Sequence, residues 1–126
     1  MVLKIVFYIA IVAVVMIGVM IPSVFADATY DSFKDISGQD NTPQGLTFNT
    51  DGTKMFLAGN AGNDIGEYAC STGFDVSTCA FTDNRSVSGQ ESSPSDVAFS
   101  TDGKKMFVSG FTGDDVNEYS LYVGFD

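Results

Sequence analysis

Acid–base chemistry in this chain would depend on carboxylates. The sequence contains no histidine, which excludes Ser-His-Asp and Cys-His nucleophilic arrangements, histidine-based zinc or iron sites and the usual general base near neutral pH. The candidate residues are acidic side chains in the second half of the chain: Asp64, Glu67, Asp114, Asp115 and Glu118. Because a residue that recurs at a fixed spacing usually serves the fold, and Asp64 recurs as Asp115, we expect no catalytic and no cofactor-binding residue.

The same aspartates are the candidate metal ligands. Calcium is the ion that carboxylate oxygens of Asp64, Asp114 and Asp115 would take. Asp64 and Asp115 each follow a glycine-containing loop, where a short acidic side chain bonds its own backbone and shapes the turn. We favour that structural role and expect no bound metal. Glu67 and Glu118 precede tyrosines, and we expect them to be strand-paired or solvent-facing.

These residues belong to a segment that occurs twice. Residues 43–75 return as residues 94–126 with a constant offset of 51 residues and no gap. The identical pairs that identify the repeat include Asp51-Gly52 with Asp102-Gly103 and Glu67-Tyr68 with Glu118-Tyr119. A fixed period of this size is typical of solenoids and propellers.

Each repeat is expected to contain short antiparallel strands, at 45–49, 54–58, 64–70 and 78–82 in the first copy. Asp51-Gly52 supplies the positive φ angles of a tight hairpin turn, and no segment of the repeat has the apolar spacing of a helix. The consecutive apolar residues Met55, Phe56 and Leu57 predict a strand covered on both faces. The predicted fold is therefore all-β and β-propeller-like, with two four-stranded antiparallel blade repeats of period 51 after an N-terminal signal peptide.

The first 26 residues are not part of that fold. One lysine precedes a charge-free run over residues 5–21, and small residues follow at Val24 and Ala26. This pattern predicts a signal peptide over residues 1–26, cut between Ala26 and Asp27; the alternative is an uncleaved N-terminal anchor. In either case the rest of the chain is expected to be secreted or to lie at the extracytoplasmic cell surface.

Residues 27–126 are then interpreted as a partial β-propeller. Shifted by the repeat period, residues 27–39 align with residues 78–90, and Ser37-Gly38-Gln39 recurs as Ser88-Gly89-Gln90. We therefore expect an outer strand over 27–39, a first blade repeat over 40–90 and an incomplete second one over 91–126.

Two cysteines, Cys70 and Cys79, are the only ones in the sequence. An even number in an exported chain favours a disulfide, and an antiparallel pairing of the third and fourth strands would bring the two residues within bridging distance. Closing so short a loop would stabilise the fold by about 2–3 kcal/mol. Leu121 stands where Cys70 stands in the first repeat, so the bridge is expected in one blade only.

The charge balance excludes some partners. The net charge is −10, with 16 acidic and 6 basic residues, and nucleic acids and anionic membrane surfaces attract the opposite composition. We expect no nucleic acid partner, and membrane contact only through an uncleaved N-terminal segment.

The pattern P-x-x-[LV]-x-F-x-x-D-G-x-K-M-F-[LV], followed by G-x-x-x-D-[IV]-x-E-Y, resembles the YVTN-type and lactonase-like β-propeller repeats over residues 28–126. The resemblance implies a propeller fold but not one function, because propellers have many functions. A lactonase site would need histidines that this chain lacks, so no catalytic residue is transferred from that family.

The predicted function is that of an exported, non-catalytic propeller module for protein or glycan binding or scaffolding at the cell surface. The alternative is a fragment of a propeller enzyme, a lactonase-like hydrolase or a dehydrogenase, whose active residues lie in missing blades. Closed propellers typically have 4–8 blades. Closing the ring is therefore expected to require further blades or self-association.

Overall fold

The computed structural model describes residue 25 and residues 28–125. The expected signal peptide over 1–26 and its cleavage after Ala26 lie outside the described residues, except for Phe25. The chain divides into two units, residues 1–31 and 32–126, and all the strands described below belong to the second unit. The described residues contain strands and one short 3-10 helix, and no α-helix.

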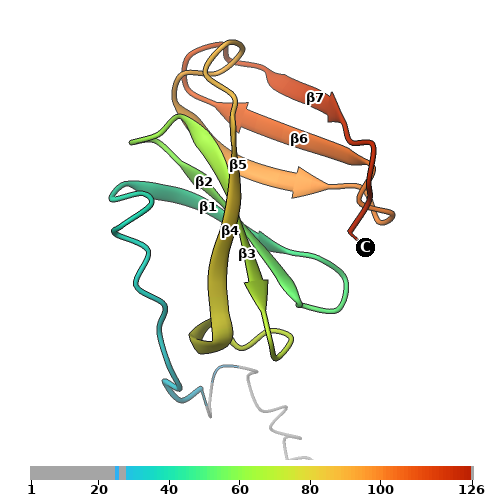
Figure 1. The fold of residues 1–126 in the computed structure, drawn as a ribbon. Helices are drawn as coiled ribbons and strands as arrows, with labels where there is room; N and C mark the ends of the chain where they lie inside the picture. Colours follow the sequence, from blue (N-terminus) through green and yellow to red (C-terminus); the bar gives the residue numbers. More distant parts are fainter. Residues whose placement is uncertain (1–24, 26–27, 126) are drawn as a thin grey trace, which may run out of the picture. The chain divides into compact units, whose positions relative to one another are not determined.

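The first sheet is a four-stranded antiparallel meander in the order β1-β2-β3-β4 (Figure 1). Its strands are β1 (Pro43–Phe48), β2 (Lys54–Gly59), β3 (Asp64–Cys70) and β4 (Cys79–Ser86), with the 3-10 helix η1 (Val76–Thr78) before β4. The turn between β1 and β2 forms as the sequence predicts. The Asp51 carboxylate accepts the Thr53 N–H at 3.0 Å, and Gly52 has a φ of 74°.

The second sheet repeats three of these strands, in the order β5-β6-β7. They are β5 (Pro94–Phe99), β6 (Lys105–Gly110) and β7 (Val116–Ser120). The register is the same as in the first sheet: Phe99 pairs with Met106 as Phe48 pairs with Met55. The prediction of an all-β fold with antiparallel sheets is confirmed, with four strands in one sheet and three in the other.

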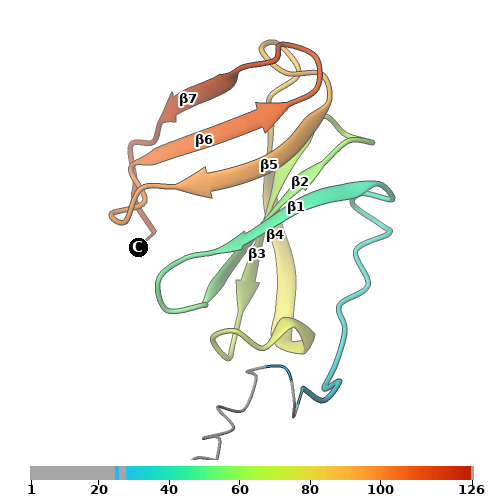
Figure 2. The same ribbon diagram turned by 180° about the vertical axis from the view of Figure 1, so that it is seen from behind.

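The two sheets pack through opposite faces. Side chains alternate between the two sides of a strand, so each sheet has two faces, named here A and B. Face A bears Phe56 and Ile65 in the first sheet and their equivalents Phe107 and Val116 in the second. Face B bears Met55, Leu57 and Tyr68 in the first sheet and Met106, Val108 and Tyr119 in the second. Face A of the first sheet packs against face B of the second, and β5 lies along β1 and β2 (Figures 1 and 2).

The first sheet is covered on both sides, as its consecutive apolar residues predict. Phe56, Ala58 and Ile65 lie in the core between the sheets. Met55, Leu57 and Tyr68 form a second cluster on face B, where Ile36 packs against them.

The outer strand expected over residues 27–39 is a wrong prediction for the described part of that segment. Residues 28–36 form no strand, and residues 37–39 form a turn. A strand requires a paired edge, and the segment pairs with no other strand here. The last residues of this segment form the same turn as their equivalents in the other repeat. Gln39 N–H donates to the Ile36 carbonyl at 2.9 Å, and Gln90 N–H donates to the Val87 carbonyl at 3.0 Å.

Candidate functional site

A buried carboxylate that the sequence analysis missed joins the start of each sheet to a loop of the same sheet. In the first sheet this residue is Asp40. Its Oδ2 accepts the N–H groups of Ala61 and Gly62 at 3.0 and 3.2 Å, and its Oδ1 accepts the Thr42 N–H at 2.6 Å. Gly59 is required beside it, because a Cβ there would lie 2.1 Å from Asp40 Oδ2. The carboxylate therefore holds the loop between β2 and β3.

Glu91 plays the same part in the second sheet, 51 residues later. Its carboxylate accepts the N–H groups of Ser93, Thr112 and Gly113 at 2.6, 3.2 and 3.3 Å, and its side chain is fully buried. Burial raises the pKa of Glu91, but the hydrogen bonds from these N–H groups outweigh it and hold the pKa below its usual value. The sequence does contain a signal for these two carboxylates, since an acidic residue directly follows Ser-Gly-Gln in both repeats.

A pocket of about 250 Å³ opens on face B of the first sheet. Its lining includes the buried Asp40 carboxylate, three further polar side chains and two aromatic rings: Gln39, Asp40, Asp64, Tyr68, Phe81 and Asn84. Asp64 Oδ2 accepts a hydrogen bond from Asn84 Nδ2 at 2.6 Å. Burial raises the pKa of Asp64, and the neighbouring Asp40 charge adds to this.

Tyr68 is the unusual member of this pocket. Its side chain is fully buried, and its hydroxyl has no hydrogen-bond partner among the described residues. Burial raises the pKa of the Tyr68 hydroxyl, followed by the charges of Asp40 and Asp64. In the second sheet, the equivalent Tyr119 hydroxyl donates to Gln90 Oε1 at 3.3 Å. The two repeats therefore differ in whether this hydroxyl is satisfied.

The three candidate metal ligands do not come together. Asp64 begins β3 of the first sheet, whereas Asp114 and Asp115 lie before β7 of the second. Asp115 Oδ1 accepts Asn117 Nδ2 at 2.8 Å, and Asp114 has a positive φ of 52°, so both help to shape a loop. No group of three or more histidine, cysteine, aspartate or glutamate side chains gathers anywhere in residues 28–125.

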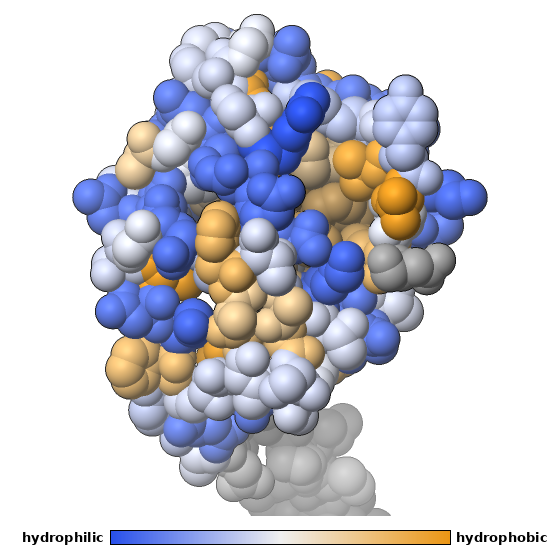
Figure 3. Space-filling model, viewed as in Figure 1, coloured by the Kyte–Doolittle hydropathy of each residue, from blue (hydrophilic) through white to orange (hydrophobic). Residues whose placement is uncertain are grey.

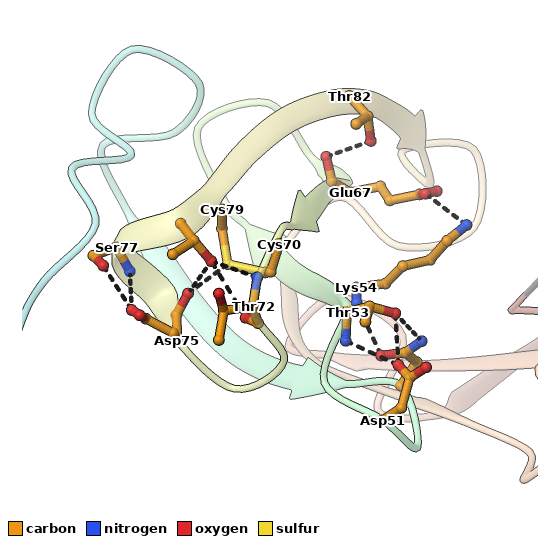
Figure 4. Close-up of a disulfide and its surroundings, with 12 residues drawn as sticks. Asp51, Thr53, Lys54, Glu67, Cys70, Thr72, Asp75, Ser77, Cys79 and Thr82 are labelled. Atoms are coloured by element: carbon orange, nitrogen blue, oxygen red, sulfur yellow. Dashed lines mark hydrogen bonds and ion pairs between the residues drawn. A yellow bond between two sulfur atoms is a disulfide. The ribbon is translucent and has the colours of Figure 1, made fainter.

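The predicted disulfide is confirmed: Cys70 and Cys79 are bonded to each other across the β3–β4 pair (Figure 4). The loop that they close is ordered by its own polar groups. The Asp75 carboxylate accepts the Ser77 N–H at 3.0 Å, and the Thr78 hydroxyl donates to the Thr72 carbonyl at 3.2 Å. A disulfide is consistent with an oxidising, extracytoplasmic location.

The residues that identify the repeat have structural roles. Lys54 pairs with Glu67 at 3.1 Å across β2 and β3 (Figure 4), and Lys105 pairs with Glu118 at the equivalent place. Gly103 has a φ of 68°, and the Asp102 carboxylate accepts the Lys104 N–H at 3.0 Å, as in the turn at Asp51. Glu67 lies opposite Phe56 on the paired strands β2 and β3, and Glu118 lies opposite Phe107 on β6 and β7.

No protein-family model matches the chain, and a search of curated proteins finds no match. Within the described residues, no helix is long and apolar enough to cross a membrane.

Proposed function

We propose that this chain is an exported, non-catalytic repeat module of the β-propeller type that mediates protein or glycan binding or scaffolding at the cell surface. The observation that carries the proposal is the relation between the two sheets. They share strand register, turn geometry and the buried carboxylate, and face A of one packs on face B of the next.

This mode of packing favours a repeat array over a closed sandwich. In a symmetric two-sheet sandwich, equivalent faces would meet. Here, non-equivalent faces meet, so the same contact can be repeated by a further sheet on either side. Successive blades of a propeller are related in this way, and an outer strand on β7 would complete the second blade.

The chemistry of the site favours binding over catalysis. The buried carboxylates of Asp40 and Glu91 are occupied by backbone N–H groups, and the recurring glutamates are paired with lysines. The Tyr68 pocket combines aromatic walls with a few convergent polar groups, a composition typical of small ligand sites. The disulfide suits an oxidising exterior, and the net charge of −10 favours solubility.

The proposal is tested by following the full chain in the cells that produce it. We expect the protein in the extracytoplasmic fraction, with an intact mass that corresponds to a start at Asp27. Purified protein should bind to the surface of these cells, and protease or periodate treatment of the cells should reduce the binding. A cytoplasmic location, or an absence of surface binding, would contradict the proposal. Turnover of lactones or of alcohol substrates by the purified chain would favour the enzyme alternative.

A further inference from the structure

We propose that face B of the first sheet binds face A of the second sheet of another copy, so that copies of this chain associate head to tail. The inference rests on the repeat architecture of the proposed function but not on its ligand. The partner is a second copy of the chain, because the same type of contact already exists once within each copy.

The first observation concerns face A. Ile65 and Val116 occupy equivalent positions on this face of the two sheets, since Ile65 pairs with Ala58 and Val116 pairs with Ser109. Ile65 is 3% exposed because the second sheet covers it, whereas Val116 is 66% exposed. Phe56 is buried and Phe107 is only half-buried, which follows the same pattern. Face A of the second sheet therefore presents apolar side chains without the cover that they have in the first.

The second observation concerns face B, where the exposed residue belongs to the first sheet and its buried equivalent to the second. Val97 and Leu46 are equivalent, and they pair with Val108 and Leu57. Val97 is 3% exposed because the first sheet covers it, whereas Leu46 is 52% exposed. In the view of Figure 3, apolar side chains gather in the middle of the surface, where β3 and β4 lie in Figure 1. Face B of the first sheet is therefore open at β1, where the equivalent β5 of the second sheet is covered, whereas Met55, Leu57 and Tyr68 on the same face are buried within their own sheet.

The two open faces are complementary in kind, because they repeat two surfaces that already fit each other. A contact between non-equivalent faces joins the copies head to tail. Two copies therefore still have one open face at each end of the pair, and further copies can add until a ring forms. Burial of exposed apolar side chains such as Leu46 and Val116 would drive the association.

One residue is expected to make the contact between two copies looser than the contact between the two sheets of one copy. A Cβ at Gly45 would lie 2.6 Å from the Asp96 Cα, so the close approach of β1 and β5 requires glycine there. The equivalent of Gly45 in the second sheet is Asp96 itself. A second copy must therefore stand further from β5 than the first sheet does, and Asp96→Gly should strengthen the association.

The negative charge of the chain also weakens the association between copies. Each copy carries a net charge of −10, so copies repel at low ionic strength. Salt screens this repulsion over about 8–10 Å at physiological concentration. Association should increase with salt, unlike an association driven by opposite charges.

The experiment is sedimentation of the full chain over a range of protein and salt concentrations. We expect reversible association that strengthens with salt and with Asp96→Gly. Leu46→Glu changes the open face B, and Val116→Glu changes the open face A; each should weaken association at least ~10-fold. Phe111→Glu adds the same charge at an exposed apolar residue of the β6–β7 loop and should leave association unchanged.

Mixing the two face variants gives the decisive result. Leu46→Glu retains an intact face A and Val116→Glu retains an intact face B, so the mixture should form a heterodimer that neither variant forms alone. Circular dichroism establishes that both variants are folded. A wild-type chain that stays monomeric at high concentration and salt would overturn the inference. So would an association that Leu46→Glu abolishes and Val116→Glu leaves unchanged, because that pattern indicates a symmetric contact between equivalent faces.

Discussion

The two sheets of this protein have the same register and the same alternation of apolar residues but lie in different surroundings. Ile65 of the first sheet is buried and its equivalent Val116 is exposed, while Leu46 is exposed and its equivalent Val97 is buried. The residue types differ little between these pairs. The burial of an apolar side chain in this fold is therefore decided by which face of its sheet has a neighbour, and not by its place within the repeat.

The second difference is at the outer edge. The first sheet is completed by β4, and the disulfide ties this strand to β3. In the second sheet, Leu121 packs against the core at the position where Cys70 forms the bridge in the first. A repeat can thus lack the bridge while its turns and buried carboxylates stay the same.

The largest expected effect comes from truncating the matched face A residues. Ile65→Ala should lower the free energy of unfolding by about 2–5 kcal/mol, because it leaves a cavity between the sheets. Val116→Ala should change it by no more than about 0.5 kcal/mol, because the side chain is exposed. Urea unfolding at low protein concentration measures both. Equal losses would mean that Val116 is covered in solution, and the contrast between the sheets would fail.

A smaller effect is expected from the bridge that only the first sheet has. Replacing Cys70 and Cys79 together by serine should lower the free energy of unfolding by about 2–3 kcal/mol, since the unfolded chain is then no longer constrained by the short loop. Thermal unfolding of the variant and the oxidised wild type gives the difference. Alkylation with and without reductant checks the starting state: two thiols that react fully without reductant would show that the exported protein lacks the bridge.

The smallest expected effect is a difference in pH dependence. The pKa of Glu91 is lowered in the folded protein by its hydrogen bonds with backbone N–H groups. Its contribution to stability is therefore present above the pKa of the unfolded chain, about 4.5, and is lost as the pH falls through the folded value. Glu91→Gln should lower stability near neutral pH and flatten its acid dependence.

Asp64 serves as a control because its pKa is shifted in the opposite direction to that of Glu91. Its pKa is raised in the folded protein by burial and by the Asp40 charge, so its contribution decreases as the pH rises through the folded value. Asp64→Asn should therefore make the loss of stability on acidification steeper. Urea unfolding between pH 7 and pH 3 measures both variants. A Glu91→Gln profile parallel to that of the wild type would contradict the assignment.

The local features of the fold follow directly from the sequence. Asp51-Gly52 predicts the tight turn because only glycine adopts its positive φ without strain. The spacing of Cys70 and Cys79 on adjacent antiparallel strands predicts the bridge. The run Met55-Phe56-Leu57 predicts a strand with two covered faces, and the structure places these residues in two separate clusters. Each of these features depends on residues close together in the chain.

The buried carboxylates show where such reasoning stops. Asp40 and Glu91 are acidic residues in polar loops, and they would be expected to face solvent. They are buried because backbone N–H groups some twenty residues further along the chain converge on them. That convergence exists only after β1 and β2, or β5 and β6, have paired.

The sequence by itself determined the repeat, its turns, its strands and the cysteine pair, because these depend on local backbone preferences and on side-chain alternation. Only the tertiary structure decided that residues 28–36 form no strand and that non-equivalent faces of the two sheets meet. It also decided that, among the described residues, the Tyr68 hydroxyl has no hydrogen-bond partner where the Tyr119 hydroxyl has one. These features depend on which distant segments come to lie beside each other. The alternation of apolar residues is the same in both segments, so it cannot by itself specify which faces will be covered.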